Sequence, residues 1–426
     1  MTETLRGMRD VCRPIPFMGV IRVVHEASKL GFRNGHPDWC NLGQGQPEIG
    51  DIAGAPPRDH KLSVSHQDCA YGPVEGIDEL REAVAAHYNR LFRKGKASQY
   101  RKENVAIASG GRLILSRLLA TLGNLKLGHL VPDYTAYEDL IDYHLHRFEP
   151  VTLTVGAEDA FMLTPRALEH QIEAHGLDAL LFSNPCNPTG AVVAGKTLAD
   201  YVETARRQAC WLLLDEFYSH FIYDDEGGAG DGPVSAASYV NDVDRDPVVI
   251  VDGLTKGFRY PGWRLGWILG PPELVSAVAR AASAIDGGPS TIVQRLTVPI
   301  LQPDRADQET AAVRSVFARK RKLMLERLLA MGIDVPAPGK GTFYLWVRLA
   351  KLPAPLNDAD TFFRAALEQR VMTVPGYYFD VNPGQRRAET LIDHSWMRLS
   401  YGPKEENLLL GLDRLERMIR GSGDRA

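Results

Sequence analysis

The chain has 426 residues, 44% of them hydrophobic, so it is long enough to bury one large core and a second, smaller one. Its 49 Lys and Arg nearly balance its 53 Asp and Glu, for a net charge of -4, which argues against a general role on nucleic acids or anionic membranes. Five cysteines without a CxxC pair are typical of reduced thiols, and residues 1–6 lack the basic-then-apolar pattern of a signal peptide, so a soluble cytoplasmic protein is expected.

Short apolar runs alternate with amphipathic helical patterns between about residues 70 and 300. The first helix is predicted over residues 77–92, where apolar side chains share one face and Gly95 follows as a stop. Further helices are predicted at 113–122 and 198–206, and strands at 105–108, 179–182, 211–214 and 248–251. Such alternation is typical of βα units that build a mostly parallel sheet.

The last part of the chain, from about residue 305, has a different pattern. A long helical pattern comes first, and the segment 342–347 then has the composition of a strand. Within the helical pattern, residues 319–322 form a basic run among apolar positions at helical spacing, which is typical of a solvated helix face. This part is therefore predicted to form a smaller α+β unit.

The most informative pair of residues is Asp215 and Lys256. Asp215 ends the apolar run 211–214, and Lys256 lies in the segment 252–264. A lysine amine can form a Schiff base with the aldehyde of pyridoxal phosphate, and a carboxylate can keep the pyridine nitrogen protonated, so that the ring accepts electrons. Arg264 supplies a cation for the cofactor phosphate. These residues together predict a pyridoxal phosphate enzyme.

Around this pair, the chain resembles the class I and II aminotransferases of the fold type I pyridoxal phosphate enzymes. The resemblance runs from about Asn41 to Pro403 and rests on several motifs in the family's order. It implies an α/β, aspartate aminotransferase-like fold, with a mostly parallel seven-stranded sheet in a large domain and a smaller α+β domain. The expected division is 1–69 for the N-terminal arm and part of the small domain, 70–304 for the cofactor-binding domain and 305–426 for the C-terminal small domain.

A phosphate site is predicted where Ser109-Gly110-Gly111-Arg112 follows a strand and opens a helix. Unhindered backbone N–H groups at the positive end of a helix dipole can bind an anion. This segment occupies the position of the family's phosphate cup, so the resemblance implies that Gly110, Gly111 and Arg112 hold the phosphate. It also implies that the ring of Tyr134 stacks on the cofactor.

Further matches to the family assign the residues around the cofactor ring and the substrate. Asn187 can donate an amide hydrogen to the phenolic oxygen of the cofactor, and Tyr218 matches the second partner of that oxygen. Arg398 matches the arginine that binds the substrate α-carboxylate, with Gly45 and Asn187 beside it. Tyr71 matches the tyrosine that reaches the cofactor phosphate of the neighbouring subunit, which implies a homodimer with shared active sites.

Two departures from the family pattern affect the predicted site. Gly253 stands where many relatives have a phosphate-binding serine, and Thr255 is the candidate to replace that hydroxyl. The polar stretch 380–394 separates Gly376 from Arg398 by more than is usual, and it is expected to approach the mouth of the site. The substrate side chain stays open, because the sequence shows no clear second cation for a dicarboxylate.

The implied activity moves the α-amino group of an amino acid to a 2-oxo acid. Lys256 would hold the cofactor as an internal aldimine and then act as general base on the Cα proton. Other pyridoxal phosphate reactions on amino acids, namely elimination, cyclisation or carbon–carbon bond formation, and oxidation, use the same residues and stay open. No metal is expected, since no second pair at zinc-site spacing accompanies His66 and Cys69.

A rival interpretation comes from residues 190–197, which satisfy the G-x-x-x-x-G-K-[ST] phosphate-loop pattern with Lys196 as its lysine. A true phosphate loop runs directly from a strand into its helix, whereas residues 184–189, with two prolines, intervene here. A helix with Thr197 as its N-cap explains the segment more simply. A nucleotide-hydrolysing ATPase is therefore the remote alternative.

Overall fold

The computed structural model describes residues 19–58, 63–224 and 232–423, so the N-terminal segment 1–6 lies outside the described residues. The centre of the molecule is a seven-stranded sheet with the order β2-β8-β7-β6-β5-β3-β4. Strand β8 pairs antiparallel with β2 and β7, and the other neighbours pair parallel. The strands are β2 (Val105–Ala108), β3 (Leu125–Val131), β4 (Phe148–Thr154), β5 (Ala179–Ser183), β6 (Trp211–Asp215), β7 (Val248–Gly253) and β8 (Gly266–Leu269).

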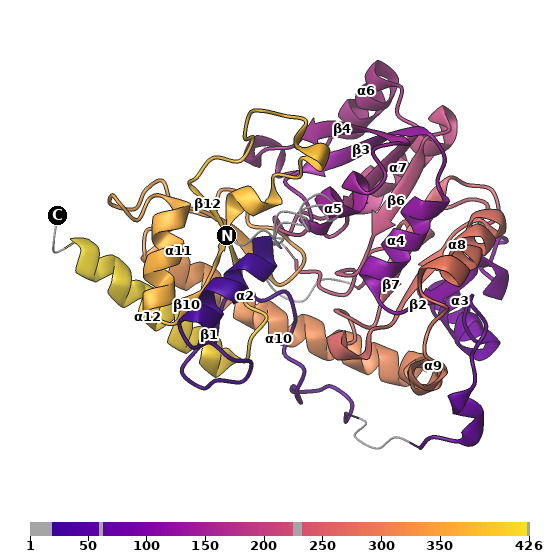
Figure 1. Cartoon of the computed structure of the whole chain (residues 1–426), viewed down its shortest axis with the longest axis horizontal. Coiled ribbons are helices and arrows are strands. Elements are labelled where there is room, and N and C mark those ends of the chain that lie inside the picture. The colour runs from indigo at the N-terminus through magenta and orange to yellow at the C-terminus, as the bar shows by residue number, and fades with distance from the viewer. Residues whose placement is uncertain (1–18, 59–62, 225–231, 424–426) are drawn as a thin grey trace, which may run out of the picture.

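Helices cover both faces of this sheet (Figure 1). They are α3 (Asp78–Phe92), α4 (Gly111–Thr121), α5 (Ala136–Asp142), α6 (Pro165–His175), α7 (Gly195–Gln208), α8 (Pro272–Ile285) and α9 (Thr291–Thr297). Along β6, Leu213 packs in the cluster that contains α4 and α8, whereas Leu212 and Leu214 pack in the cluster that contains α3 and α7. Because successive strand residues point to opposite faces, a continuous apolar run buries both.

A second part of the molecule is built from the two ends of the described chain. Strand β1 (Cys40–Asn41) pairs parallel with β10 (Val371–Met372). Beside them lies a three-stranded antiparallel sheet of β11 (Val374–Pro375), β12 (Trp396–Ser400) and β9 (Tyr344–Arg348). Its helices are α2 (Gly19–Lys29), α10 (Pro303–Ala330), α11 (Ala359–Glu368) and α12 (Glu405–Gly423). The pairing of β1 with β10 joins the N-terminal part of the described chain to its C-terminal part, as expected if part of 1–69 belongs to the small domain.

Most predicted elements are confirmed, but two details are wrong. Helix α7 begins at Gly195, and its N-cap is Ala194, so Thr197 lies inside the helix and does not cap it. Only half of the basic run in α10 is solvated: Arg319 and Lys322 are exposed, whereas Lys320 is 1% exposed, pairs with Glu48 and donates to the Pro403 carbonyl oxygen at 2.6 Å. Helix α10 crosses the lower part of the molecule (Figure 1) and packs on several sides, so Lys320 and Arg321 donate to backbone carbonyls.

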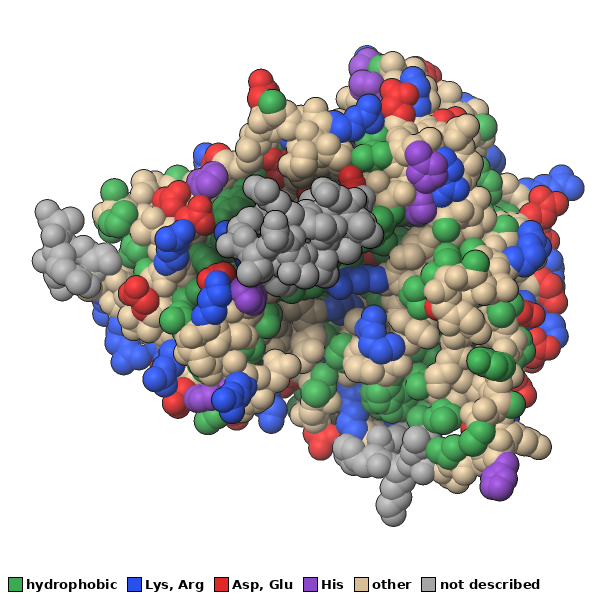
Figure 2. All heavy atoms as spheres, in the orientation of Figure 1, with side chains coloured by type: hydrophobic (Ala, Val, Ile, Leu, Met, Phe, Trp, Pro, Cys, Tyr) green, Lys and Arg blue, Asp and Glu red, His purple; other side chains and the backbone are tan. Residues whose placement is uncertain are grey.

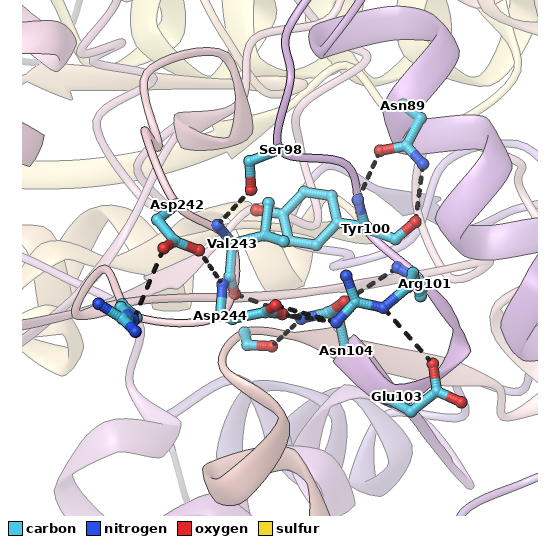
Figure 3. Close-up of polar contacts among 11 residues, drawn as sticks. Asn89, Ser98, Tyr100, Arg101, Glu103, Asn104, Asp242, Val243 and Asp244 are labelled. Carbon is cyan, nitrogen blue, oxygen red and sulfur yellow. Dashed lines mark hydrogen bonds and ion pairs between the residues drawn. The ribbon is translucent and has the colours of Figure 1, made fainter.

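Asn104 holds one edge of the large sheet together. Its side chain is buried, and its Nδ2 donates to the carbonyl oxygens of Val243 (3.3 Å) and Gly270 (3.2 Å) and to Oδ1 of Asp244 (3.0 Å). Its Oδ1 accepts the backbone N–H of Arg101 at 2.9 Å (Figure 3). One amide therefore joins the start of β2, the end of β8 and the loop that leads into β7.

Replacement of Asn104 by alanine should lower the free energy of unfolding by about 2–3 kcal/mol, because buried carbonyl groups lose their donor. Arg101→Ala is the matched control: it removes a half-exposed ion pair with Asp244 from the same cluster and should cost less than about 1 kcal/mol. Urea unfolding of both variants measures the difference. Equal losses in the two variants would contradict the role given to the buried amide.

Candidate active site

A cavity of about 630 Å³ opens between the large sheet and the small-domain sheet, at the carboxyl ends of the parallel strands. Asp215 lies there at the end of β6, Ser183 at the end of β5 and Lys256 just beyond β7. Basic side chains occur in the hollow near the centre of the face drawn in Figure 2. Helix α2 contributes the apolar side chains of Val20 and Val24 to the cavity wall.

Most of the predicted site residues line this one cavity. They are Gly45, Gly111, Arg112, Tyr134, Asn187, Asp215, Tyr218, Thr255, Lys256, Arg264 and Arg398. Gly110 lies just behind the lining, against the Arg264 guanidinium. Tyr71 does not line the cavity; its side chain is 99% exposed. Residues that are hundreds of positions apart in the chain therefore meet, and Tyr71 is the exception.

Lys256 extends into the cavity from the turn after β7. Its Nζ donates to the carbonyl oxygen of Gly45 and lies 5.7 Å from the centre of the Tyr218 ring. Removal from bulk water, together with the nearby cation of Arg398, lowers the pKa of the Lys256 amine to about 7, and Asp215 opposes this shift. A large fraction of the amine is therefore neutral near pH 7, as a nucleophile or general base requires.

Asp215 is a buried carboxylate that faces the same cavity. Its Oδ2 accepts the Tyr137 hydroxyl at 3.1 Å, and its Oδ1 accepts the backbone N–H of Phe217 at 3.4 Å. Burial raises the pKa of Asp215 to about 6, while these hydrogen bonds and Lys256 hold it down. Such a carboxylate fits a cationic N–H donor, which a protonated pyridine nitrogen supplies. Tyr137 was missed in the sequence, where it has the pattern of a core residue of α5.

The opposite end of the cavity has room for a phosphate. Gly110 has φ +96°, and a Cβ atom there would lie 2.5 Å from Nη2 of Arg264. A Cβ at Gly111, the first residue of α4, would lie 2.5 Å from the ring of Phe217. Only glycine leaves this helix N-terminus open beside a guanidinium, an arrangement that suits an anion. Arg112 lies next to it and donates to the hydroxyl of Tyr134 at 3.0 Å.

The packing around Gly253 accounts for the glycine that stands where many relatives have a phosphate-binding serine, and Thr255 offers a hydroxyl nearby. A Cβ at Gly253 would lie 2.5 Å from the Leu265 carbonyl oxygen and 2.6 Å from Cα of Gly266, because β7 and β8 approach closely there. No serine fits at this position without a backbone shift. The hydroxyl of Thr255, two residues on, lines the cavity and is buried without a hydrogen-bond partner among the described residues. That unpaired hydroxyl fits a phosphate oxygen.

Arg398 lies on β12 and is buried at 1% exposure, so it is not a surface residue. It donates to Oδ1 of Asn187 at 2.8 Å and to the carbonyl oxygen of Gly43 at 2.8 Å. Its Nε has no partner in the described part of the chain, and its guanidinium carbon lies 4.1 Å from the centre of the Tyr344 ring. A buried planar cation that lines the cavity and keeps an unpaired N–H suits a carboxylate.

Tyr344, on β9, was missed by the sequence analysis. Its hydroxyl forms a hydrogen bond of 2.9 Å with the hydroxyl of Tyr218, and it lines the cavity. In the sequence it lies within the predicted strand 342–347, where an aromatic residue is usually a packing residue. Only the position of β9 opposite the large sheet brings it to the site.

The stretch 380–394, which was expected to approach the mouth of the site, packs on α5 and contributes no residue to the cavity lining. The backbone N–H of Asn382 and the side-chain amide of Gln385 donate to Glu138 of α5, at 2.8 and 2.9 Å. Arg387 pairs with Asp380 at 2.6 Å and turns the stretch back on itself. None of its residues is among those that line the cavity. These contacts hold it against α5.

The phosphate-loop pattern does not form a phosphate site. The side chain of Lys196 is 85% exposed and pairs with Asp200, one helical turn later, at 2.7 Å. A Cβ at Gly190 would lie 2.9 Å from the carbonyl oxygen of Gly341, so this glycine serves close backbone packing. Asp215 faces Lys256 and not Lys196.

Within residues 19–58, 63–224 and 232–423, no group of three or more His, Cys, Asp or Glu side chains is placed to hold a metal ion. No helix in the same ranges is long and apolar enough to cross a membrane.

Comparisons with known proteins identify the family to which the chain is similar. The sequence pattern of the family described as aminotransferase class I and II matches residues 37–415. The aspartate/prephenate aminotransferase of Cereibacter sphaeroides is 28% identical over 414 residues, which cover 94% of this chain and 96% of that protein. The aspartate aminotransferase of Pyrococcus abyssi is also 28% identical, over 91% and 93% of the two chains.

Solved structures show the same fold. The aspartate aminotransferase of Thermus thermophilus, solved with maleate, superposes with a TM-score of 0.76 at 24% identity, over 98% of this chain and 99% of that one. An aromatic aminotransferase of Pyrococcus horikoshii superposes with a TM-score of 0.73, over 94% and 99%. The predicted aspartate aminotransferase-like fold is therefore confirmed.

The lowered pKa of Lys256 predicts how its reactivity depends on pH. In the cofactor-free protein, labelling of Lys256 by an amine-reactive ester should rise through about pH 7 and then level off, whereas an ordinary lysine reaches its plateau only above about pH 10. Arg398→Met removes a neighbouring cation and should shift the rise to higher pH; Arg348→Met, on the exposed side of β9, should not. Mass spectrometry of the labelled peptide measures the profile. A rate that still climbs at pH 10 would disprove the shift.

Proposed function

Because the chain belongs to the class I and II aminotransferases, and is thus a pyridoxal phosphate-dependent transferase, we propose that the cavity around Lys256 is its active site. There the α-amino group of an amino acid passes to a 2-oxo acid. The observation that carries the proposal is the meeting of the Lys256 amine, the Asp215 carboxylate and the Arg398 guanidinium in one cavity.

The cofactor, when bound, supplies an electron sink that acidifies the Cα–H bond of the amino acid. Asp215 holds its pyridine nitrogen through a charged hydrogen bond. The backbone N–H groups at the N-terminus of α4, the Arg264 guanidinium and the Thr255 hydroxyl hold its phosphate. The remaining contacts in this proposal are the stacked ring of Tyr134, the cation of Arg112 and the phenolic-oxygen partners Asn187 and Tyr218.

Arg398 binds the α-carboxylate of the substrate and so orients the Cα–H bond toward Lys256. Its bond to Asn187 fixes the amide so that Nδ2 is free to point to the cofactor side. The Lys256 amine, neutral in much of the population near pH 7, takes the proton from Cα and would deliver it to the cofactor carbon that takes over the amino group. Gly45 leaves space for the substrate beside this amine, since its nearest non-neighbouring contact, the Tyr344 hydroxyl, lies 3.6 Å from where a Cβ would stand.

The substrate side chain would lie beside α2. Val20, Ile21 and Val24 give this wall an apolar character, and Arg112 is a cation on the lining. The relatives named above carry names for acidic and aromatic substrates. A donor screen for this enzyme should therefore include apolar, aromatic and acidic amino acids, each with a 2-oxo acid acceptor.

We also propose a homodimer in which Tyr71 completes the partner's site. Tyr71 follows the short helix η1 (His66–Cys69), which is anchored to α9 by an ion pair between Asp68 and Arg295. A large aromatic side chain held in place and 99% exposed suits burial in an interface. Its hydroxyl would then reach the cofactor phosphate of the neighbouring subunit.

A cytoplasmic location completes the proposal. Four cysteines in the described ranges, Cys40, Cys69, Cys186 and Cys210, are free thiols, and all but Cys69 are buried. Free buried thiols are typical of a reducing compartment.

Lys256→Ala tests the assignment of the active site. The wild-type protein loaded with cofactor should have a visible absorption band that borohydride bleaches, with the reduced group attached to Lys256. The variant should lose this attachment and at least about 10³-fold in kcat, measured as new amino acid formed from a 2-oxo acid. Lys196→Ala is the control and should be silent, since its exposed amine only pairs with Asp200. Full turnover by Lys256→Ala would refute the assignment.

Mixing two inactive variants tests whether Tyr71 acts across the dimer. Tyr71→Ala should bind the cofactor weakly, and Lys256→Ala should be inactive. In a mixed dimer, the Lys256 site of the first subunit receives Tyr71 from the second. An equal mixture, dissociated and reassembled, should recover about a quarter of wild-type activity, because half of the dimers are mixed and each has one intact site. No recovery would mean that Tyr71 serves its own subunit or no site at all.

A further inference from the structure

Tyr344 touches both functional ends of the site. Its hydroxyl lies 2.9 Å from the hydroxyl of Tyr218, the proposed partner of the cofactor phenolic oxygen. Its ring lies under Arg398, with the guanidinium carbon 4.1 Å from the ring centre. The side chain is fully buried, and its strand β9 pairs with β12, the strand that carries Arg398. The phenol and the guanidinium are thus fixed on one small sheet.

The numbers of hydrogens and acceptors at the two hydroxyls indicate which of them donates in the bond between Tyr344 and Tyr218. Burial raises the pKa of both phenols, so both keep their hydrogens, and each hydroxyl has one to donate. If Tyr218 donates its hydrogen to the cofactor, its oxygen can only accept in the bond to Tyr344. Tyr344 is then the donor. A hydroxyl that accepts a hydrogen bond is a better donor itself, because hydrogen bonds in a chain polarise one another.

We propose that Tyr344 is a positioning residue that acts on both ends of the active site. Its hydroxyl orients and polarises Tyr218 toward the phenolic oxygen of the cofactor, and its ring supports Arg398 against the substrate carboxylate. The proposal rests on the proposed function, in particular on the role given to Tyr218. The effect of the hydroxyl on Tyr218 and the effect of the ring on Arg398 can be separated, because a phenylalanine at position 344 keeps the ring and loses the hydroxyl.

The first readout is the pKa of the visible absorption band of the cofactor-loaded enzyme without substrate. A hydrogen bond to the phenolic oxygen stabilises the form of the bound cofactor that has lost its proton. A weaker bond therefore raises this pKa. Tyr344→Phe should raise it by about half a pH unit, and Tyr218→Phe should raise it further.

The second readout is KM for the amino acid. Tyr344→Phe should leave KM unchanged, because the ring under Arg398 remains. Tyr344→Leu removes the ring and should raise KM about fivefold. Tyr401→Phe is the matched control: Tyr401 is a buried tyrosine that donates to the Thr342 carbonyl oxygen at 3.1 Å, outside the cavity lining, so its loss should move neither readout.

The double variant Tyr218→Phe/Tyr344→Phe shows whether Tyr344 acts through Tyr218. Its band should titrate at the pKa of Tyr218→Phe alone, since no hydroxyl is left for Tyr344 to polarise. Additive shifts, or an unshifted pKa in Tyr344→Phe beside a shifted one in Tyr218→Phe, would overturn the proposal and leave the proposed function standing. An unshifted pKa in both single variants would instead remove the role given to Tyr218, and with it the basis of the inference.

Discussion

The cavity depends on backbone carbonyl groups of one N-terminal segment, which receive cations from both parts of the molecule. Arg398 of the small-domain sheet donates to Gly43, and Lys256 of the large domain donates to Gly45. Further along, Arg259 donates to the carbonyl oxygens of Glu48 and Gly50. Carbonyl oxygens buried beside these cations need donors, and the cations need acceptors. The segment 43–50 therefore closes the site, because its carbonyl oxygens accept hydrogen bonds from cations of both the large domain and the small-domain sheet.

Burial away from water shifts the pKa values of the two central groups of the cavity. It lowers the pKa of Lys256 to about 7 and raises that of Asp215 to about 6. In water the two groups would titrate several units apart, as a firm cation and a firm anion. Burial moves both pKa values toward neutrality, where an amine can gain and lose a proton in each cycle. The cation of Arg398 adds to the effect on Lys256, so the group that binds the substrate also prepares the base.

The site residues that the sequence pointed to are those with special backbone or charge chemistry. Glycines at 110 and 111 stand out because the start of α4 leaves no room for a side chain, and the acid at the end of β6 and the lysine after β7 stand out as charged groups that follow apolar strands. Tyr137 and Tyr344 carry no such mark. They lie at apolar positions of a helix and a strand, and only their tertiary neighbours turn them into polar partners of Asp215 and Tyr218.

The sequence by itself determined the alternation of strands and helices, the family and the residue types around the cofactor, since these depend on local periodicity and motif order. Tertiary structure alone decided the rest. It buried Lys320 against Glu48 where a solvated face was predicted, and it packed the stretch 380–394 onto α5. It also left Lys196 in solvent despite a complete motif. Each outcome depends on which distant groups come within hydrogen-bond distance, and that is set by how the layers pack and not by the local sequence.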